Sequence, residues 1–388
     1  MTGSNVSTLE TLRPDKIADL AGSPAPCVTI LLPPYRPQEQ AKSAATMLRS
    51  YCQDAERQLT ARQVPRSEVT DLIEPLQVLG AIADFKTTSH WGRAIFRSTE
   101  VFTMLEGIEG VKPGVTVGAR FQLRSVLADL NLPAYFLLLK LSQKSVELWR
   151  CAGRRAKPVE LPKGVPRTLD EALAFKPPDH DLENRSSAGS STGSMAAVRF
   201  GTGSERERAQ RYVADFFKAV DRGIRELVHA GETPLVLAGV DEDTGLYRLV
   251  TSYPRVLGES IHGSANSPFS TDELLERAYA IVRSDSTERT GAALLDLKER
   301  MAPARFSTNL DAILSAASDG RVGWLYINQD ARALGVFGGV SEQPASDWGE
   351  EDLLNVAAVE TLRHGGLAFS LPPDKMPDAA SVLAVFRY

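Results

Sequence analysis

A long amphipathic helix, predicted to follow Ser204, places the strongest constraint on how this chain can fold. At about 100° per residue, one face of this helix is apolar and carries Ala209, Val213, Phe216, Val220, Ile224 and Leu227. The opposite face is basic, is interrupted by Asp215, and carries Arg211, Lys218, Arg222, Arg225 and His229. Such a helix must bury its apolar face, and the neighbouring apolar segments predict a sheet for it to pack on. The basic face is either an ordinary solvated surface or a strip that follows a phosphate backbone.

The segment before this helix, residues 177–204, is rich in serine and glycine and predicts a long loop. Ser204 and Glu207 fit a capping box at the helix start, and Gly201 and Gly203 allow a tight turn before it. Helix N-termini attract anions, so a phosphate is an alternative ligand. A phosphate-binding P-loop would need a lysine after the glycines, and Glu205 would repel a nucleotide.

Composition and charge exclude several classes of protein. The net charge of −5 argues against bulk binding to nucleic acid, so any contact with RNA must come from local patches. No run approaches the ~18 apolar residues that span a bilayer, and the N-terminus lacks a signal-peptide pattern. Cys27, Cys52 and Cys151 have no metal-binding spacing. We therefore expect a cytoplasmic protein without a membrane partner, a structural zinc site or a cofactor.

The length of the chain predicts two or three domains, and the order of elements predicts an α/β (α+β) protein with three segments, at residues 1–131, 132–266 and 267–388. The first segment predicts strands at 26–35 and 93–105, with helices at 39–63 and 67–79 between them.

The middle segment predicts an antiparallel meander, then the amphipathic helix and a buried strand at 233–240, which together make a mixed sheet. The second turn of the meander is crowded with basic residues, namely Arg150, Arg154, Arg155 and Lys157.

The third segment predicts helices capped at Ser270 or Thr271 and at Thr308. A strand at 321–328, a helix at 350–366 and two closing strands complete this segment.

Recognisable catalytic motifs are missing from the sequence, and we predict no catalytic residue and no metal ligand. Asp179, His180, Asp181 and Glu183 form a small acidic cluster within the polar loop. One alternative hypothesis joins this cluster to the helix start at Gly201–Ser204, as an enzyme site for a phosphorylated small molecule. Another is a protein-binding adaptor that uses the first domain and the long loop.

Several stretches, taken in order, resemble the bacterial members of the archaeo-eukaryotic release factor family, of the family-3 type. They include "YFLLLKLSQKSVELWR", "HDLENRSSAGSS", "FGTGSERE", "PLVLAGVDEDTGLYRLVTSYPRVL" and the ending "NVAAVETLRHGGLAFSLPPDKMPDAASVLAVFRY". This family is related to eukaryotic peptide-release factors and to Pelota. The resemblance covers residues 132–388 clearly and the first segment loosely. It implies that the three segments are three domains: an N-terminal α/β domain, a ribonuclease H-like middle domain and an L7Ae-like C-terminal domain.

In release factors the corresponding loop carries Gly-Gly-Gln, which helps water attack the peptidyl ester. Residues 184–204 contain no such tripeptide. The resemblance therefore implies a ribosome-binding protein that enters the A site in rescue, dormancy or stress, without hydrolysis of peptidyl-tRNA. The resemblance also suggests an elongation-type GTPase as a partner. We do not expect the protein to bind DNA. The residues expected to contact rRNA are Asn184, Arg185, Ser186, Ser187, Arg199, Gly201, Thr202, Gly203, Arg206, Arg211, Lys218, Arg222 and Arg225.

Overall fold

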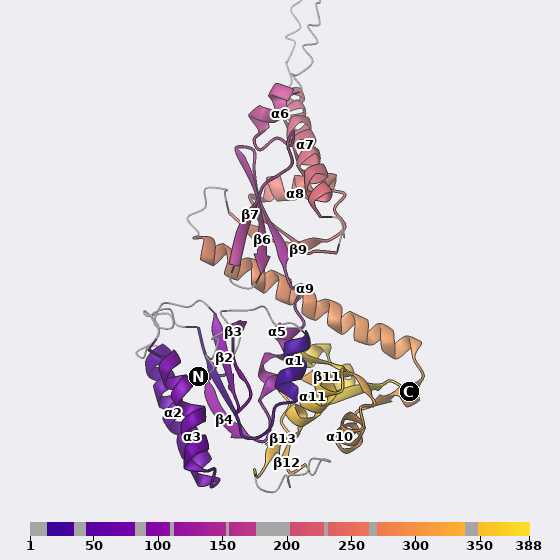
Figure 1. Ribbon diagram of the computed structural model, residues 1–388. Helices are drawn as coiled ribbons and strands as arrows, with labels where there is room; N and C mark the ends of the chain where they lie inside the picture. Colours follow the sequence, from indigo (N-terminus) through magenta and orange to yellow (C-terminus); the bar gives the residue numbers. More distant parts are fainter. Residues whose placement is uncertain are drawn as a thin grey trace, which may run out of the picture. The chain divides into compact units, whose positions relative to one another are not determined.

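The computed structural model divides the chain into two compact units (Figure 1). Unit 1 combines residues 1–134 with 282–388, and unit 2 is the continuous stretch 135–281. The structure describes residues 14–34, 44–81, 91–108, 112–152, 155–175, 202–228, 232–263, 270–337 and 348–388. In these ranges, no helix is both long and apolar enough to cross a bilayer.

Unit 2 is built on a five-stranded mixed sheet, as expected for the middle segment. Its strands, in the spatial order β7-β6-β5-β8-β9, are β7 (Arg155–Val159), β6 (Ser145–Ala152), β5 (Phe136–Ser142), β8 (Leu235–Gly239) and β9 (Val256–His262). The first three form the antiparallel meander, and β8 and β9 run parallel to β5. The helices are α6 (Leu169–Phe175), α7 (Thr202–Leu227) and α8 (Asp241–Val250).

The core of unit 2 lies between its sheet and its helices. Alternate residues of a strand point to the same face. The odd-numbered leucines of β5, which are Leu137, Leu139 and Leu141, therefore join one apolar cluster with the buried face of α7. All five residues of β8 are buried, which confirms the buried strand expected from its continuous apolar run.

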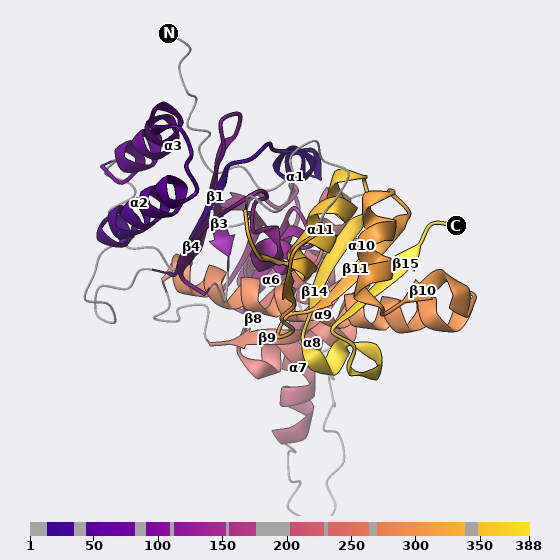
Figure 2. The ribbon, with the colours of Figure 1, turned by 90° about the horizontal axis from the view of Figure 1, so that it is seen from below.

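The N-terminal part of unit 1 is an antiparallel sheet in the order β3-β2-β1-β4. Its strands are β1 (Cys27–Leu32), β2 (Gly92–Arg97), β3 (Phe102–Ile108) and β4 (Gly114–Gly118). The helical elements are α1 (Pro14–Ala21), α2 (Ala44–Ala61), α3 (Arg66–Leu79), the 3₁₀ turn η1 (Leu123–Val126) and α5 (Leu127–Leu130). Val28, Ile30 and Leu32 of β1 pack against α2 and α3, which lie on one side of this strand in Figure 2.

The C-terminal part of unit 1 contains a second sheet, in the order β10-β15-β11-β14. Its strands are β10 (Phe306–Ser307), β11 (Val322–Asn328), β14 (Leu367–Leu371) and β15 (Val382–Phe386), and β12 (Leu334–Gly335) pairs with β13 (Glu351–Asp352). The helices are α9 (Thr271–Arg300), α10 (Leu310–Ser318) and α11 (Leu353–Arg363), with 3₁₀ turns η2 (Pro303–Arg305), η4 (Pro373–Lys375) and η5 (Pro377–Ala379). The first residues of α9 belong to unit 2, since the boundary between the units falls after Ile281.

The two parts of unit 1 share one apolar core. Leu31 and Phe96 of the first sheet lie in the same buried cluster as Ile313 of α10, Leu325 of β11 and Leu354 of α11. Figure 2 shows α1 and α11 on the side of β1 that faces away from α2 and α3. The outer two of the three expected segments therefore build one folding unit.

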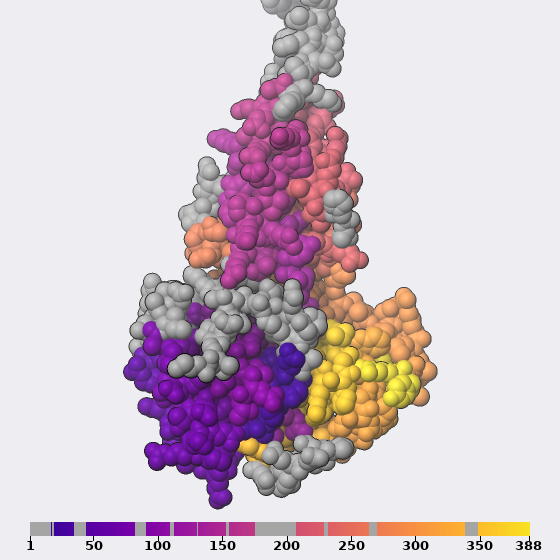
Figure 3. Space-filling model, in the orientation of Figure 1, coloured from indigo at the N-terminus to yellow at the C-terminus, as the bar shows by residue number. Residues whose placement is uncertain are grey.

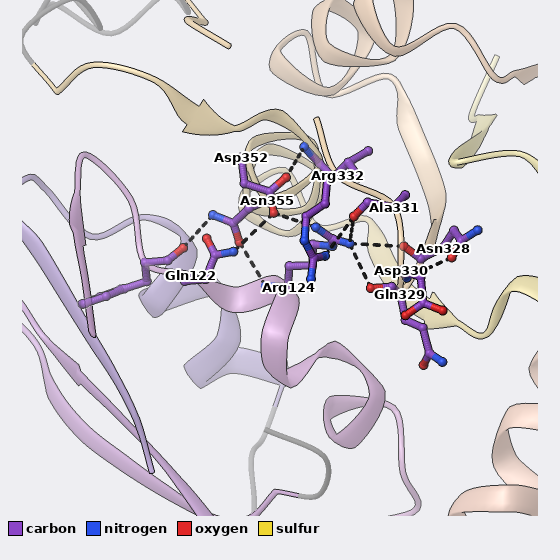
Figure 4. A network of polar contacts seen from close by, with 11 residues as sticks. Gln122, Arg124, Asn328, Gln329, Asp330, Ala331, Arg332, Asp352 and Asn355 are labelled. Carbon is purple, nitrogen blue, oxygen red and sulfur yellow. Dashed lines mark hydrogen bonds and ion pairs between the residues drawn. The ribbon is translucent and has the colours of Figure 1, made fainter. Parts of the chain in front are cut away.

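Polar side chains reinforce this shared core (Figure 4). Arg124 donates to a carboxylate oxygen of Asp352 at 2.7 Å and to the backbone carbonyl oxygens of Asn328, Gln329 and Ala331. Asn355, buried on α11, donates to the carbonyl oxygen of Phe121 at 2.9 Å. These contacts join the turn after β4 to α11 and to the loop after β11.

The structure corrects two helix starts that the sequence predicted. Asn309 caps α10, because its side-chain oxygen accepts from the backbone N–H of Ala312, so the prediction of Thr308 was wrong. Helix α7 begins at Thr202, so Ser204 lies inside the helix and cannot be its N-cap. The prediction at Ser270 is confirmed, since Ser270 and Glu273 exchange the two hydrogen bonds of a capping box.

Candidate nucleic-acid interface

Helix α7 is held on the sheet of unit 2 by a broad apolar face. Val213, Phe216, Val220 and Ile224 are buried, as expected from the helical period, and Phe217 is buried beside them. The prediction was wrong at both ends of the helix, because Ala209 is exposed and Leu227 is 38% exposed. Burial of the middle of α7 against the leucines of β5 fixes which side of the helix remains open to solvent.

A buried carboxylate fixes the rotation of α7 against α8. Asp221, which is 3% exposed, accepts from the hydroxyl of Tyr247 at 3.2 Å and from the backbone N–H of Ser252 at 3.0 Å. It also accepts from the hydroxyl of Thr251 and pairs with Arg225 at 3.2 Å. Burial, together with the charge of Asp221, raises the pKa of Tyr247, so its hydroxyl remains a donor. These contacts of Asp221 fix the orientation of α7, so that its opposite face is exposed to solvent.

The outward face of α7 carries a row of exposed cations. Arg211, Lys218, Arg222 and Arg225 are all exposed, as a nucleic-acid interface requires. Lys218 pairs with Asp215 at 3.2 Å, and Arg225 pairs with Asp221. Within the described ranges, Arg211 and Arg222 have no acidic partner. These two arginines are therefore the best placed to meet an external anion.

Arg208 extends this row and was missed by our reading of the sequence. It is exposed, and it lies three residues before Arg211 and seven before Asp215, so it falls on the same helix face. The signal was the spacing 208, 211, 215, 218, 222, 225, which repeats every three or four residues. Glu207 and Glu226 are also exposed and flank the row, so its positive charge is moderate. We use the name basic row for Arg208, Arg211, Lys218, Arg222 and Arg225.

The other predicted contact residues lie at or beyond the start of α7. Thr202, Gly203 and Arg206 belong to the first two turns of the helix, where the structure describes the backbone alone. Six more fall outside the described residues: Asn184, Arg185, Ser186, Ser187, Arg199 and Gly201. The acidic cluster at Asp179, His180, Asp181 and Glu183 also falls outside them.

A second group of polar residues gathers at the carboxyl ends of the parallel strands in unit 2. Asp241, after β8, pairs with His262 at the end of β9, and both side chains are exposed. Asp243 is buried and accepts from Gln143 at 3.4 Å; its burial raises the pKa of its carboxyl group. In the part of the chain that the structure describes, no group of three or more His, Cys, Asp or Glu residues could hold a metal ion.

The three cysteines are placed as core residues. Cys27, Cys52 and Cys151 are all buried, and burial raises their thiol pKa values to about 12, 11 and 12 respectively. A thiol must ionise before it can act as a nucleophile, so none of them fits that role at neutral pH.

We expect these thiols to be unreactive toward an aromatic disulfide reagent at pH 8 in the native protein. In denaturant all three should react, and the yield of the released thiolate gives the count. The same shifts predict alkaline destabilisation: the native state keeps thiol protons that the unfolded chain loses, so stability falls as pH rises from about 9 to about 12. Reaction of any thiol in the native state at the unfolded rate would contradict the assignment.

Comparison with known proteins gives one family match. Residues 135–321 match the model of bacterial archaeo-eukaryotic release factor family 3, a range that includes all of unit 2. No curated protein matches the chain by sequence.

The chain is also similar to several solved structures, at low identity. An archaeal translation termination factor, aRF1, is 13% identical, with 97% of this chain and 99% of that chain covered and a TM-score of 0.25. Pelota of Archaeoglobus fulgidus is 12% identical over 77% of this chain and 80% of its own, with a TM-score of 0.36. Dom34 of S. cerevisiae is 9% identical over 77% and 81%, with a TM-score of 0.31. These TM-scores are too low to establish a shared arrangement of the whole chain.

Proposed function

From the match of residues 135–321 to bacterial archaeo-eukaryotic release factor family 3, we propose that the protein is a cytoplasmic translation factor of this family that binds the ribosome. The observation that carries the proposal is the basic row of α7, which lies inside the matched range and faces solvent. At 1.5 Å per residue, the row extends about 26 Å from Arg208 to Arg225, enough to follow several phosphates of an RNA strand.

The proposed role is binding without hydrolysis of peptidyl-tRNA. The loop that precedes α7 contains no Gly-Gly-Gln, so the glutamine that would position water in a release factor is missing from the sequence. We propose entry into the A site during rescue, dormancy or stress. Delivery by an elongation-type GTPase would suit such a role.

The overall charge of the chain makes this binding depend on local contacts. With a net charge of −5, the protein as a whole does not attract RNA, so the attraction must come from local groups of cations such as the basic row. Each phosphate neutralised by a cation releases counterions, which makes the affinity fall steeply with salt. Contacts of this kind should therefore be strongest at low ionic strength.

Co-sedimentation with ribosomes through a sucrose gradient tests the proposal. We expect the wild-type protein to sediment with ribosomes at low salt, and the double variant Arg211→Glu/Arg222→Glu to remain largely at the top. Titrations at several salt concentrations should show that the slope of log affinity against log salt falls by about 1.4–1.8, or about 0.7–0.9 for each lost contact.

The control is a variant with the same change of charge in unit 1. Arg49 and Arg66 are exposed on α2 and α3, so Arg49→Glu/Arg66→Glu should still sediment like the wild type. Failure of the wild-type protein to associate at low salt would refute ribosome binding. Equal binding by the two double variants would instead show that the basic row is not the contact.

A further inference from the structure

The hairpin of β6 and β7 presents a second group of cations. In its antiparallel register, Arg150 lies opposite Lys157, and Ala152 lies opposite Arg155. Alternate residues of a strand share a face, so Arg150, Arg155 and Lys157 all project from the same face of the hairpin. All three are exposed, and the chain segment that contains these strands lies at the surface in Figure 3 (magenta). We call these three residues the hairpin cluster.

The positive charge of the hairpin cluster is not neutralised by the residues around it. Among the described residues, no carboxylate pairs with any of the three side chains. The acidic residue of β6, Glu147, is an odd-numbered residue on the other face of the strand, where it pairs with Lys140 at 3.1 Å. The cluster therefore differs from the basic row, in which two of the cations have acidic partners.

An aromatic ring holds one member of the cluster, Arg150, in place. The guanidinium of Arg150 lies over the ring of Tyr135, 3.9 Å from its centroid. This cation–π contact orients the planar guanidinium and leaves its positive charge in place. A guanidinium held in this way can offer two parallel N–H groups to a phosphate.

The register also gives the cluster a cost in stability. Side chains directly opposite each other on paired strands have Cβ atoms about 4.5–5.5 Å apart, and like charges in such a position repel. The fold keeps Arg150 and Lys157 in this position with no acidic partner among the described residues. A bound anion would remove this repulsion. The unneutralised pair of Arg150 and Lys157 therefore indicates that an anionic ligand binds here.

We propose that the hairpin cluster is a second binding site for RNA phosphates, in addition to the basic row. The inference rests on the proposed function, because it is rRNA that supplies the phosphates. Three exposed cations spread over two strands form an open surface, whereas small-molecule sites are concave and bury most of their ligand. A phosphate backbone, which presents charges in series along an open surface, fits this arrangement.

The variant Lys157→Glu tests the site and controls for folding at once. It places a carboxylate opposite Arg150, so the repelling pair becomes an attracting one, and we expect an unchanged or higher Tm. Binding of a fluorescent single-stranded uridine oligonucleotide, followed by anisotropy, should nevertheless weaken, with the slope of log affinity against log salt reduced by about 0.7. The triple variant Arg150→Gln/Arg155→Gln/Lys157→Gln should reduce the slope by about 2.

Two matched variants serve as controls for Lys157→Glu. Lys157→Arg keeps the charge and should keep wild-type binding. Lys144 is exposed in the turn at the other end of β6, so Lys144→Glu makes the same charge change away from the cluster and should bind like the wild type. Wild-type affinity and slope in Lys157→Glu, or equal losses in Lys144→Glu and Lys157→Glu, would overturn the site, as would a wild-type protein that does not bind the oligonucleotide at low salt.

Ribosome co-sedimentation of the same variants separates this inference from the proposed function. If the wild type sediments with ribosomes and the triple glutamine variant does so equally well, the hairpin cluster is refuted while the function stands. If the wild type does not sediment but its oligonucleotide binding still depends on Lys157, the function is refuted and the phosphate site stands.

Discussion

Replacing Arg124 by alanine should lower the free energy of unfolding of unit 1 by about 3–5 kcal/mol, the range measured when one partner of a buried ion pair is removed. Arg124 is 7% exposed, and its partner Asp352 is 15% exposed. Without the guanidinium, the carboxylate of Asp352 keeps its hydrogen bonds to the backbone N–H of Leu354 and to Gln122, and it loses its buried cation.

The effect should be large because this side chain joins three parts of the chain. Besides Asp352, the guanidinium of Arg124 binds three carbonyl oxygens of the loop after β11 (Figure 4). Hydrogen bonds to a charged group contribute about 1.5–3 kcal/mol each. The oxygens of Asn328 and Ala331 keep a second donor, the backbone N–H of Ala331 and the guanidinium of Arg332 respectively, so the loss of these bonds adds to that of the ion pair without leaving the two oxygens unpaired. The substitution should therefore lower the stability of the whole of unit 1, and its effect should not be confined to η1.

Urea unfolding followed by tryptophan fluorescence measures this change. Three of the four tryptophans, Trp91, Trp324 and Trp348, belong to unit 1, so the signal reports mainly on that unit. The control is Arg321→Ala, since Arg321 forms an exposed ion pair with Asp319 in the same unit. Exposed pairs of this kind contribute about 0–1 kcal/mol. Similar midpoints for the two variants would show that the buried network contributes no more than a surface pair.

Local periodicity made most of the secondary structure predictable. The apolar run at 27–32, the helix formers at 44–61 and the meander at 136–159 each carry their own signal, and the structure has elements at these positions. The helical period also identified the outer face of α7, because that face is decided within a single element. Helix α8 and strand β9 were missed, since both are short and neither has a clean apolar alternation.

Contacts between residues far apart in the sequence were beyond such reasoning. Arg124 and Asp352 are 228 positions apart, and neither has a local pattern that points to the other. The same holds for the hairpin cluster. Its basic residues are visible in the sequence, but the repulsion between Arg150 and Lys157 follows only from the strand register. Residues 184–201, where much of the predicted interface lies, fall outside the described residues, so their contact with rRNA remains a prediction.

The shared core of unit 1 leads to a second prediction with a large effect: residues 282–388 alone should not fold. In the full chain their apolar side chains pack with Leu31, Phe96, Phe121 and Leu127 from the N-terminal segment. Removal of residues 1–134 would expose this surface to water, at about 25 cal/mol for each Å² of apolar area. Stabilities of whole domains are only about 5–15 kcal/mol, so the loss should unfold the fragment.

The same geometry predicts that unit 1 will fold without unit 2. Arg283, just after the boundary, pairs with Asp129, just before it, with 3.3 Å between guanidinium nitrogen and carboxylate oxygen. The two ends of the removed segment therefore lie close together, and a short glycine–serine linker can join residue 134 to residue 282. Residues 135–281 should also fold alone, since their apolar cluster draws on side chains from Leu137 to Val256.

Circular dichroism and urea titration of three polypeptides test this arrangement. We expect cooperative unfolding for the linked unit 1 and for residues 135–281, and a weak, sloping signal without a transition for residues 282–388. The size of the m-value, which scales with the surface exposed on unfolding, distinguishes a packed fragment from a collapsed one. A cooperative transition in residues 282–388 alone would mean that the C-terminal segment is an independent domain. Its contacts with Leu31 and Phe96 would then connect two cores that each form without the other.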